Sequence, residues 1–129
     1  MPIERIISDV PAPLEVPLSH AVRAGDFVFI AGQIAVRADG TQVKGDFKEE
    51  TRAVLDNVKA AVESAGGSLS DISKTTVFLL NARLFDPMNE VYREYFAQPF
   101  PARSTIVAPL SDPDLRIEIE AIAYIPQNR

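Results

Sequence analysis

The stretch Phe100-Pro101-Ala102-Arg103-Ser104-Thr105 is followed, beyond a loop that contains Pro109 and Pro113, by the alternating stretch Ile117-Glu118-Ile119-Glu120. We expect both stretches to be β-strands and to lie side by side, which would bring one arginine close to one carboxylate. An arginine that opens a strand can bind a small carboxylate through two parallel hydrogen bonds, and a partly buried glutamate can move a proton or orient a water. Arg103 and Glu118 are therefore the candidate catalytic residues.

The composition indicates one folded domain and excludes several kinds of chemistry. The 129 residues, of which 47% are hydrophobic and 24% charged, are enough to bury a core, and we expect a single domain over residues 1–129. The absence of cysteine excludes disulfides and thiolate nucleophiles, and one histidine, His20, cannot supply a zinc ligand set. No serine lies in a sequence typical of a nucleophile elbow. We therefore expect no metal site and no serine-histidine catalysis.

The charge argues against nucleic acid as a partner. The formal net charge is -5, and there is no basic run of the kind that releases counterions from a phosphate backbone. No apolar stretch approaches the roughly 18 residues of a membrane span, and the first residues lack the pattern of a secretory signal. We expect a cytoplasmic protein that binds neither nucleic acid nor membrane.

Hydrophobic periodicity predicts an α+β order of β-β-β-α-β-α-β-β. Gly25 marks a tight turn between the second and third strands, and Pro11, Pro13 and Pro17 indicate an extended loop before them. The predicted strands are Ile3–Ser8, Ser19–Arg23, Phe27–Ala35, Lys74–Leu80, Ala102–Ala108 and Arg116–Ile125. The apolar end of the fourth strand, Val77-Phe78-Leu79-Leu80, suggests burial on both faces.

Two amphipathic helices complete the predicted order. The first runs from Phe47 to Ala65 and stops at Gly66-Gly67. The second has Asp86 as its N-cap and Pro87 at its first position, and it ends before Pro99. Two helices can cover only one face of a six-stranded sheet, so the other face must meet solvent or another copy of the chain. Apolar residues on that face favour an oligomer, with a site between subunits.

Several separated segments make the chain resemble the Rid family, also called YjgF or L-PSP, over nearly its whole length. The segments are Arg23–Asp26 with Ala31–Ile34, Leu55–Lys59, Ile72–Phe78, Asn89–Tyr92, Pro101–Ser104 and Ile117–Ala121. The resemblance implies a chorismate-mutase-like fold and a homotrimer with clefts between subunits. It also implies hydrolysis of reactive enamines and imines, such as 2-aminoacrylate, to 2-keto acids and ammonia, without a metal or organic cofactor.

The resemblance also assigns roles to particular residues. Arg103 matches the arginine that binds the substrate carboxylate, and Glu118 matches the glutamate proposed to hold the attacking water or relay a proton. The backbone at Gly32 and Thr105 matches ligand contacts, while Phe85 and Asn89 match residues that line the cleft. The best-known deaminases carry a tyrosine and a serine at two further positions of the predicted substrate-binding set. This chain has Leu18 and Ala31 there instead. These replacements remove two hydrogen-bonding groups and favour either a less polar substrate or a slower reaction with the usual one.

Other interpretations remain open for the chain and its residues. One alternative is a pathway-specific deaminase of an aminomuconate-type or aminoacrylate-type intermediate. Another is a trimer that binds keto acids without turnover. An endoribonuclease or translation inhibitor is less consistent with the acidic charge. Glu118 and Glu120 share a strand face, and Glu118 is the one that matches the motif. His20 is either a proton carrier at the cleft mouth or an ordinary strand histidine. Tyr92 and Tyr95 have the spacing of helix-core residues.

Overall fold

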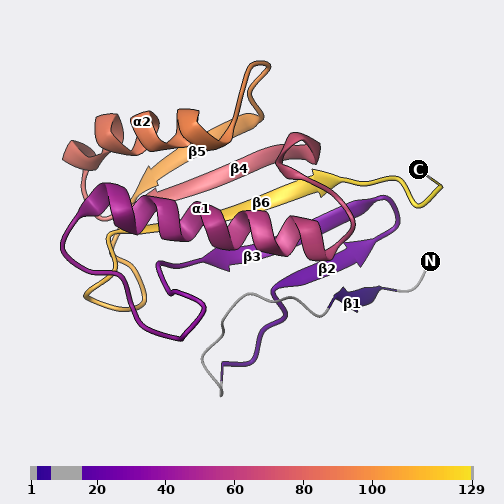
Figure 1. Ribbon diagram of the computed structural model, residues 1–129, viewed down its shortest axis with the longest axis horizontal. Coiled ribbons are helices and arrows are strands. Elements are labelled where there is room, and N and C mark those ends of the chain that lie inside the picture. Colours follow the sequence, from indigo (N-terminus) through magenta and orange to yellow (C-terminus); the bar gives the residue numbers. More distant parts are fainter. Residues whose placement is uncertain (1–2, 7–15, 129) are drawn as a thin grey trace.

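The computed structural model describes residues 3–6 and 16–128, which form one six-stranded sheet and two α-helices (Figure 1). The elements are β1 (Glu4–Ile6), β2 (Ala21–Ala24), β3 (Phe27–Gln33), α1 (Phe47–Ser64), β4 (Ile72–Leu79), α2 (Phe85–Tyr95), β5 (Ala102–Val107) and β6 (Ile117–Tyr124). The strand order is β1-β2-β3-β6-β4-β5, and β4 and β5 are the one parallel pair. The predicted mixed sheet is confirmed.

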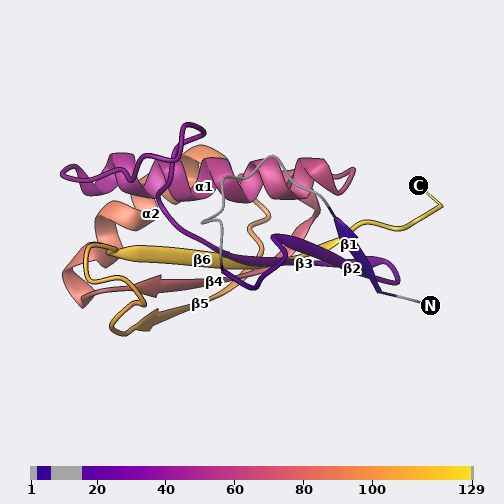
Figure 2. The same cartoon turned by 90° about the horizontal axis from the view of Figure 1, so that it is seen from below.

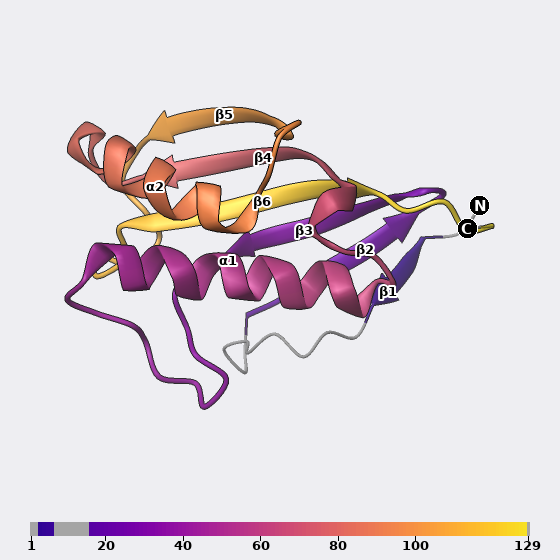
Figure 3. The same ribbon diagram turned by 45° about the horizontal axis from the view of Figure 1, so that its top comes forward.

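Both helices lie on the same face of the sheet (Figure 2). α1 packs along β6 and β3, while α2 lies nearer the β4–β5 edge (Figure 3). In β6, Ile117 and Ile119 are fully buried on the helix side, whereas Glu118 and Glu120 leave the strand on the other side. This alternation places the core between the sheet and the helices, as expected for strands with one covered face.

The ends of α1 follow from local chemistry. The Asp46 side chain caps the first turn by accepting a hydrogen bond from the backbone nitrogen of Lys48 at 2.9 Å. Gly66 adopts a φ of 89°, which stops the helix within one residue of the predicted end. Over residues 3–6 and 16–128, neither α1 nor any other helix combines the length and apolar character required to cross a bilayer.

The face away from the helices carries apolar side chains that nothing in a single chain covers. Phe27, Phe29, Ile106 and Tyr124 are 43% to 47% exposed, and the rings of Phe27 and Tyr124 lie with their centroids 5.3 Å apart. Exposed aromatic side chains gathered on one sheet face are typical of an interface. These residues agree with an oligomer, which stays a prediction.

Several predicted boundaries were wrong. α2 begins at Phe85, because a short 3₁₀ turn (Ala82–Leu84) capped by the Asn81 side chain leads directly into it, and Asp86 lies inside the first turn. β2 begins at Ala21, so His20 precedes it, and β3 ends at Gln33. Leu80 lies past β4 and is 37% exposed, so burial on both faces is wrong in a single chain. Ile7, Ser8, Pro11 and Pro13 lie outside the described residues.

The largest correction concerns the last two strands, which are not neighbours. β4 lies between them and pairs with both, with Thr75 opposite Arg103 and Phe78 opposite Glu118. A parallel pair needs a long crossover, which α2 supplies between β4 and β5. Thr75 is buried on the helix face, whereas Phe78 lies on the open face. Arg103 and Glu118 therefore leave the sheet from opposite faces.

Candidate active site

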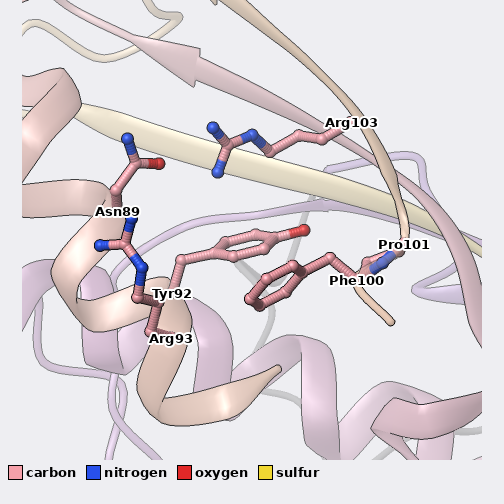
Figure 4. Close-up of a pocket in the computed structure, with 6 residues that line it drawn as sticks. All are labelled: Asn89, Tyr92, Arg93, Phe100, Pro101 and Arg103. Atoms are coloured by element: carbon pink, nitrogen blue, oxygen red, sulfur yellow. The ribbon is translucent and has the colours of Figure 1, made fainter. Parts of the chain in front are cut away.

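Arg103 lies on the edge strand β5, and its side chain extends toward Asn89 and Tyr92 of α2 (Figure 4). Its guanidinium carbon is 4.9 Å from the ring centroid of Tyr92 and 5.6 Å from that of Phe85, and Nη1 lies 3.9 Å from Sδ of Met88. Contacts of a guanidinium with aromatic faces hold its plane without using the N–H donors. Within the described part of the chain, no carboxylate forms an ion pair with Arg103.

The guanidinium opens onto a cavity of about 260 Å³. We call this cavity the Arg103 pocket. It is lined by Asn89, Tyr92, Arg93, Phe100, Pro101 and Arg103 (Figure 4). The Tyr92 hydroxyl is 2.8 Å from Oγ1 of Thr75, and burial raises the pKa of the Tyr92 phenol, so the ring is fixed and uncharged. Two cations and an amide around a cavity without an acidic group can bind a small carboxylate.

Glu118 lies on the open face of β6 and packs directly on Gly32. A β-carbon added to Gly32 would lie 2.1 Å from Oε2 of Glu118, so any side chain at this position would displace the carboxylate. The approach comes from a β-bulge, since Ile30 pairs with Ala121 but Gln33 pairs with Ile119, which leaves Ala31 and Gly32 opposite one residue of β6. The bulge therefore brings the β3 backbone against the carboxylate.

Glu118 lines a second cavity, of about 190 Å³. We call it the Glu118 cavity. It is lined by Val16, Leu18, His20, Gly32, Gln33, Ile34, Asn57, Ser111 and Glu118. Partial burial raises the pKa of the Glu118 carboxyl, and the charge of Glu120 on the same face raises it further. A carboxylate with a raised pKa is a stronger base, which suits it to take a proton from water.

The structure divides the predicted site residues into two groups on opposite faces. Phe85 contacts Arg103, Asn89 lines its pocket, and Thr105 follows Arg103 on the same face of β5. Leu18 and Gly32 line the Glu118 cavity, and Ala31 forms the bulge beside it. In one chain the two groups do not meet.

Sequence reasoning missed some members of both groups. Tyr92 was interpreted as a packing residue, yet it also holds the guanidinium; its spacing from Phe85 and Asn89 places it on their side of α2 and could have revealed this. No role was predicted for Phe100, which lines the Arg103 pocket, or for Gln33 and Asn57, which line the Glu118 cavity. No local pattern points to these three, because their positions depend on long-range packing.

Comparison with known proteins gives the chain its family. The family model Endoribonuclease L-PSP matches residues 9–125. A RutC family protein of Pyrococcus horikoshii is 50% identical over 117 residues, which cover 90% of this chain and 92% of that protein. A 2-iminobutanoate/2-iminopropanoate deaminase of Dermatophagoides farinae is 38% identical over 124 residues, covering 95% and 97%. The chain belongs to the Rid family, also called YjgF or L-PSP.

Solved structures agree with this assignment. RidA from the Antarctic bacterium Psychrobacter matches with a TM-score of 0.87 at 33% identity, over 95% of this chain and 99% of that one. Escherichia coli TdcF with bound serine matches with a TM-score of 0.85 at 35% identity, over 94% and 98%. The six-stranded mixed sheet with two helices is therefore the fold of this family.

Proposed function

We propose that the protein is an enamine and imine deaminase, which hydrolyses 2-imino acids to 2-keto acids and ammonia. The observation that carries the proposal is the Arg103 guanidinium, held by two aromatic rings and free of carboxylate partners within the described residues. Such a group selects substrates that carry a carboxylate. The names of the Dermatophagoides deaminase and of Escherichia coli TdcF, "Putative reactive intermediate deaminase", support the reaction.

The complete site is proposed to form between copies of the chain, in a homotrimer. Arg103 and Glu118 leave one sheet from opposite faces, so they can act on one molecule only if they come from different copies. The exposed aromatic residues around Tyr124 lie on the same face as Glu118, and covering them with a second copy would bury this apolar surface. The Arg103 pocket of one copy would then meet the Glu118 cavity of the next.

In this site the substrate carboxylate binds Arg103, and an enamine first tautomerises to the iminium by protonation at C3. Glu118 accepts a proton from water as the water oxygen bonds to C2, which gives a carbinolamine. Glu118 returns the proton to the amine nitrogen, and the C–N bond breaks with its electron pair leaving on nitrogen. The carbinol hydroxyl then gives its proton to the released ammonia, and C2 becomes the keto carbon. The products are a 2-keto acid and ammonium. Orientation and one acid-base group supply roughly 10²- to 10⁴-fold, which is enough because the iminium is already electrophilic.

A coupled assay tests the proposal. Imino acids are generated from several amino acids by an amino-acid oxidase, and release of the keto acid is followed with and without the protein. We expect acceleration by the wild type, loss in Arg103→Ala, and no loss in Arg83→Ala, which removes an exposed arginine just before α2. Absence of Arg103-dependent acceleration for every amino acid would refute the deaminase assignment.

A pathway-specific deaminase is a second candidate, because Leu18 lines the Glu118 cavity and Ala31 lies in the bulge beside it. Leu18 is 47% exposed and presents an apolar side chain beside Glu118. In the same assay, activity confined to one imine, rather than graded across the series, supports this narrower role.

A trimer that binds keto acids without turnover is the third candidate, because the Arg103 pocket alone supplies the groups for carboxylate binding. It needs Arg103 but not Glu118. Glu118→Gln separates the two readings: the deaminase loses turnover and keeps keto-acid binding, whereas a binding protein loses nothing. An RNA-cleaving role is disfavoured by the net charge of -5.

A further inference from the structure

His20 occupies a fixed position beside the Glu118 cavity, just before β2. Its carbonyl oxygen accepts a hydrogen bond from the backbone nitrogen of Ala31 at 2.9 Å, and its Nδ1 lies 3.1 Å from Nε2 of Gln33. The Gln33 side chain is 2% exposed, and its Nε2 also donates to the carbonyl oxygen of Ala31 at 2.9 Å. The imidazole is thus tied to the bulge that brings Gly32 against Glu118.

These contacts determine which imidazole nitrogen carries the proton. The Ala31 carbonyl can only accept, so the nearby Gln33 atom must be the amide nitrogen with its two hydrogens. The second hydrogen of that nitrogen points to Nδ1 of His20, which must therefore accept. Burial lowers the pKa of His20 and favours the neutral ring. A neutral ring that accepts at Nδ1 carries its proton on Nε2.

This Nε2–H group has no hydrogen-bond partner within residues 3–6 and 16–128. Among the described residues, Nε2 of His20 is the one buried side-chain nitrogen or oxygen without a hydrogen bond. Buried donors without partners are rare in native proteins because they lose their hydration without compensation. His20 is one of the residues that line the Glu118 cavity. An oxygen held inside that cavity would satisfy the Nε2–H donor.

We propose that His20 orients the attacking water in the completed site by donating its Nε2–H to the water oxygen; this rests on the proposed deaminase function. A water there gives one hydrogen to Glu118 and accepts one hydrogen bond from His20, which leaves a lone pair directed at C2 of the imine. His20 stays neutral and transfers no proton. The contact requires a small rotation of the ring toward the cavity, since solvent does not reach Nε2 in the single chain.

Two substitutions separate this role from simple support of the bulge. His20→Asn keeps an acceptor near the position of Nδ1 for Gln33 but has no distal N–H. His20→Gln has an N–H that reaches about as far as Nε2. We expect kcat/KM to fall about tenfold in His20→Asn, the effect of one hydrogen bond, and to fall much less in His20→Gln. KM should change little, because Arg103 binds the carboxylate. Both variants are compared with wild type by thermal unfolding.

The single histidine makes a direct measurement possible in the wild-type protein. Imidazole ¹⁵N NMR has one residue to report, so the tautomer and the pKa are assigned without ambiguity. We expect the Nε2–H tautomer, a pKa below the ordinary value of about 6.5, and a shift of the Nε2 resonance when 2-oxobutanoate is added. The proposal would be overturned by any of three results. These are an Nδ1–H tautomer, an Nε2 resonance that does not shift when 2-oxobutanoate is added, and full kcat/KM in a stably folded His20→Asn variant.

The same experiments distinguish its failure from failure of the proposed function. If the wild type accelerates imine hydrolysis through Arg103 but His20→Asn is unimpaired, the deaminase stands and the role of His20 falls. If no imine is hydrolysed, the deaminase falls and the water-orienting role falls with it. The predicted tautomer would then describe only the packing of the bulge.

Discussion

Gly32 and Gly25 show two different reasons for glycine. Gly32 has an ordinary backbone but no room for a β-carbon beside Glu118, whereas Gly25 has a φ of 64° and open space around it. The first requirement concerns the site, and the second concerns the β2–β3 turn.

We therefore expect opposite effects from alanine at these positions. Gly32→Ala displaces the end of a flexible Glu118 side chain, so the fold persists while kcat/KM falls at least about tenfold, as expected when an acid-base group is misplaced. Gly25→Ala strains the turn and costs about 1 kcal/mol of unfolding free energy with activity retained. Urea unfolding and the imine assay on both variants check this. Equal loss of stability in the two would contradict the assignment.

Glu120 should set the working pH of Glu118. Its charge is the second cause, after burial, of the raised pKa of Glu118, and a raised pKa means that the deprotonated base appears only at higher pH. Glu120→Gln removes that charge, so the acidic limb of the kcat/KM profile should move to lower pH. High salt should shrink the difference between variant and wild type because Glu120 is exposed. A limb that moves to higher pH would exclude Glu118 as the base.

At the scale of elements, an ion pair between the buried Glu50 carboxylate and the partly exposed Arg116 joins α1 to the start of β6. Glu50 is 1% exposed, and its carboxylate accepts hydrogen bonds from Nε and from the backbone nitrogen of Arg116, both at 2.8 Å. Arg116 also donates to the carbonyl oxygen of Gly45 at 2.9 Å. These bonds hold the strand that carries Glu118 against the helix layer.

Breaking this pair from one side should be costly. Arg116→Met leaves the Glu50 carboxylate buried with only a backbone donor, and we expect a loss on the order of 3 kcal/mol in unfolding free energy. The double variant Glu50→Leu with Arg116→Met should recover much of it, since no charge then remains buried. Urea unfolding of the single and double variants measures the coupling. A double variant no more stable than the single would show that packing, not charge, dominates.

The elements were predictable from the sequence because their signals are local. The apolar period of α1 and the stop at Gly66 located that helix to within one residue. The order of the strands was not predictable this way, because β4 enters between β5 and β6 through pairings far apart in the chain. Arg103 and Glu118 were chosen for their chemistry, and each lines a cavity, yet they were expected to be on neighbouring strands. The alternation of side chains along a strand shows which residues share a face. Which face of the sheet that is becomes clear only when the partner strands are known.

At the scale of the whole molecule, the two halves of the site can be tested by mixing inactive copies. Arg103→Ala and Glu118→Gln should each be inactive alone. If each cleft takes Arg103 from one copy and Glu118 from the next, co-assembled variants should regain activity in about a quarter of their clefts, as random assembly of equal amounts predicts. Sedimentation of the mixture establishes the oligomer. A mixture that stays inactive in a formed trimer would place both residues in the same copy's site.

If the protein is the proposed deaminase, the position of Arg103 and Glu118 on opposite faces of one sheet would make its activity depend on protein concentration. Under the proposed assembly, a chain that has folded but not yet met its partners is inert, and the rate per chain rises steeply as copies accumulate. Dilution alone would then switch the activity off, with no change in any residue. The abundance of the protein would act as its regulator.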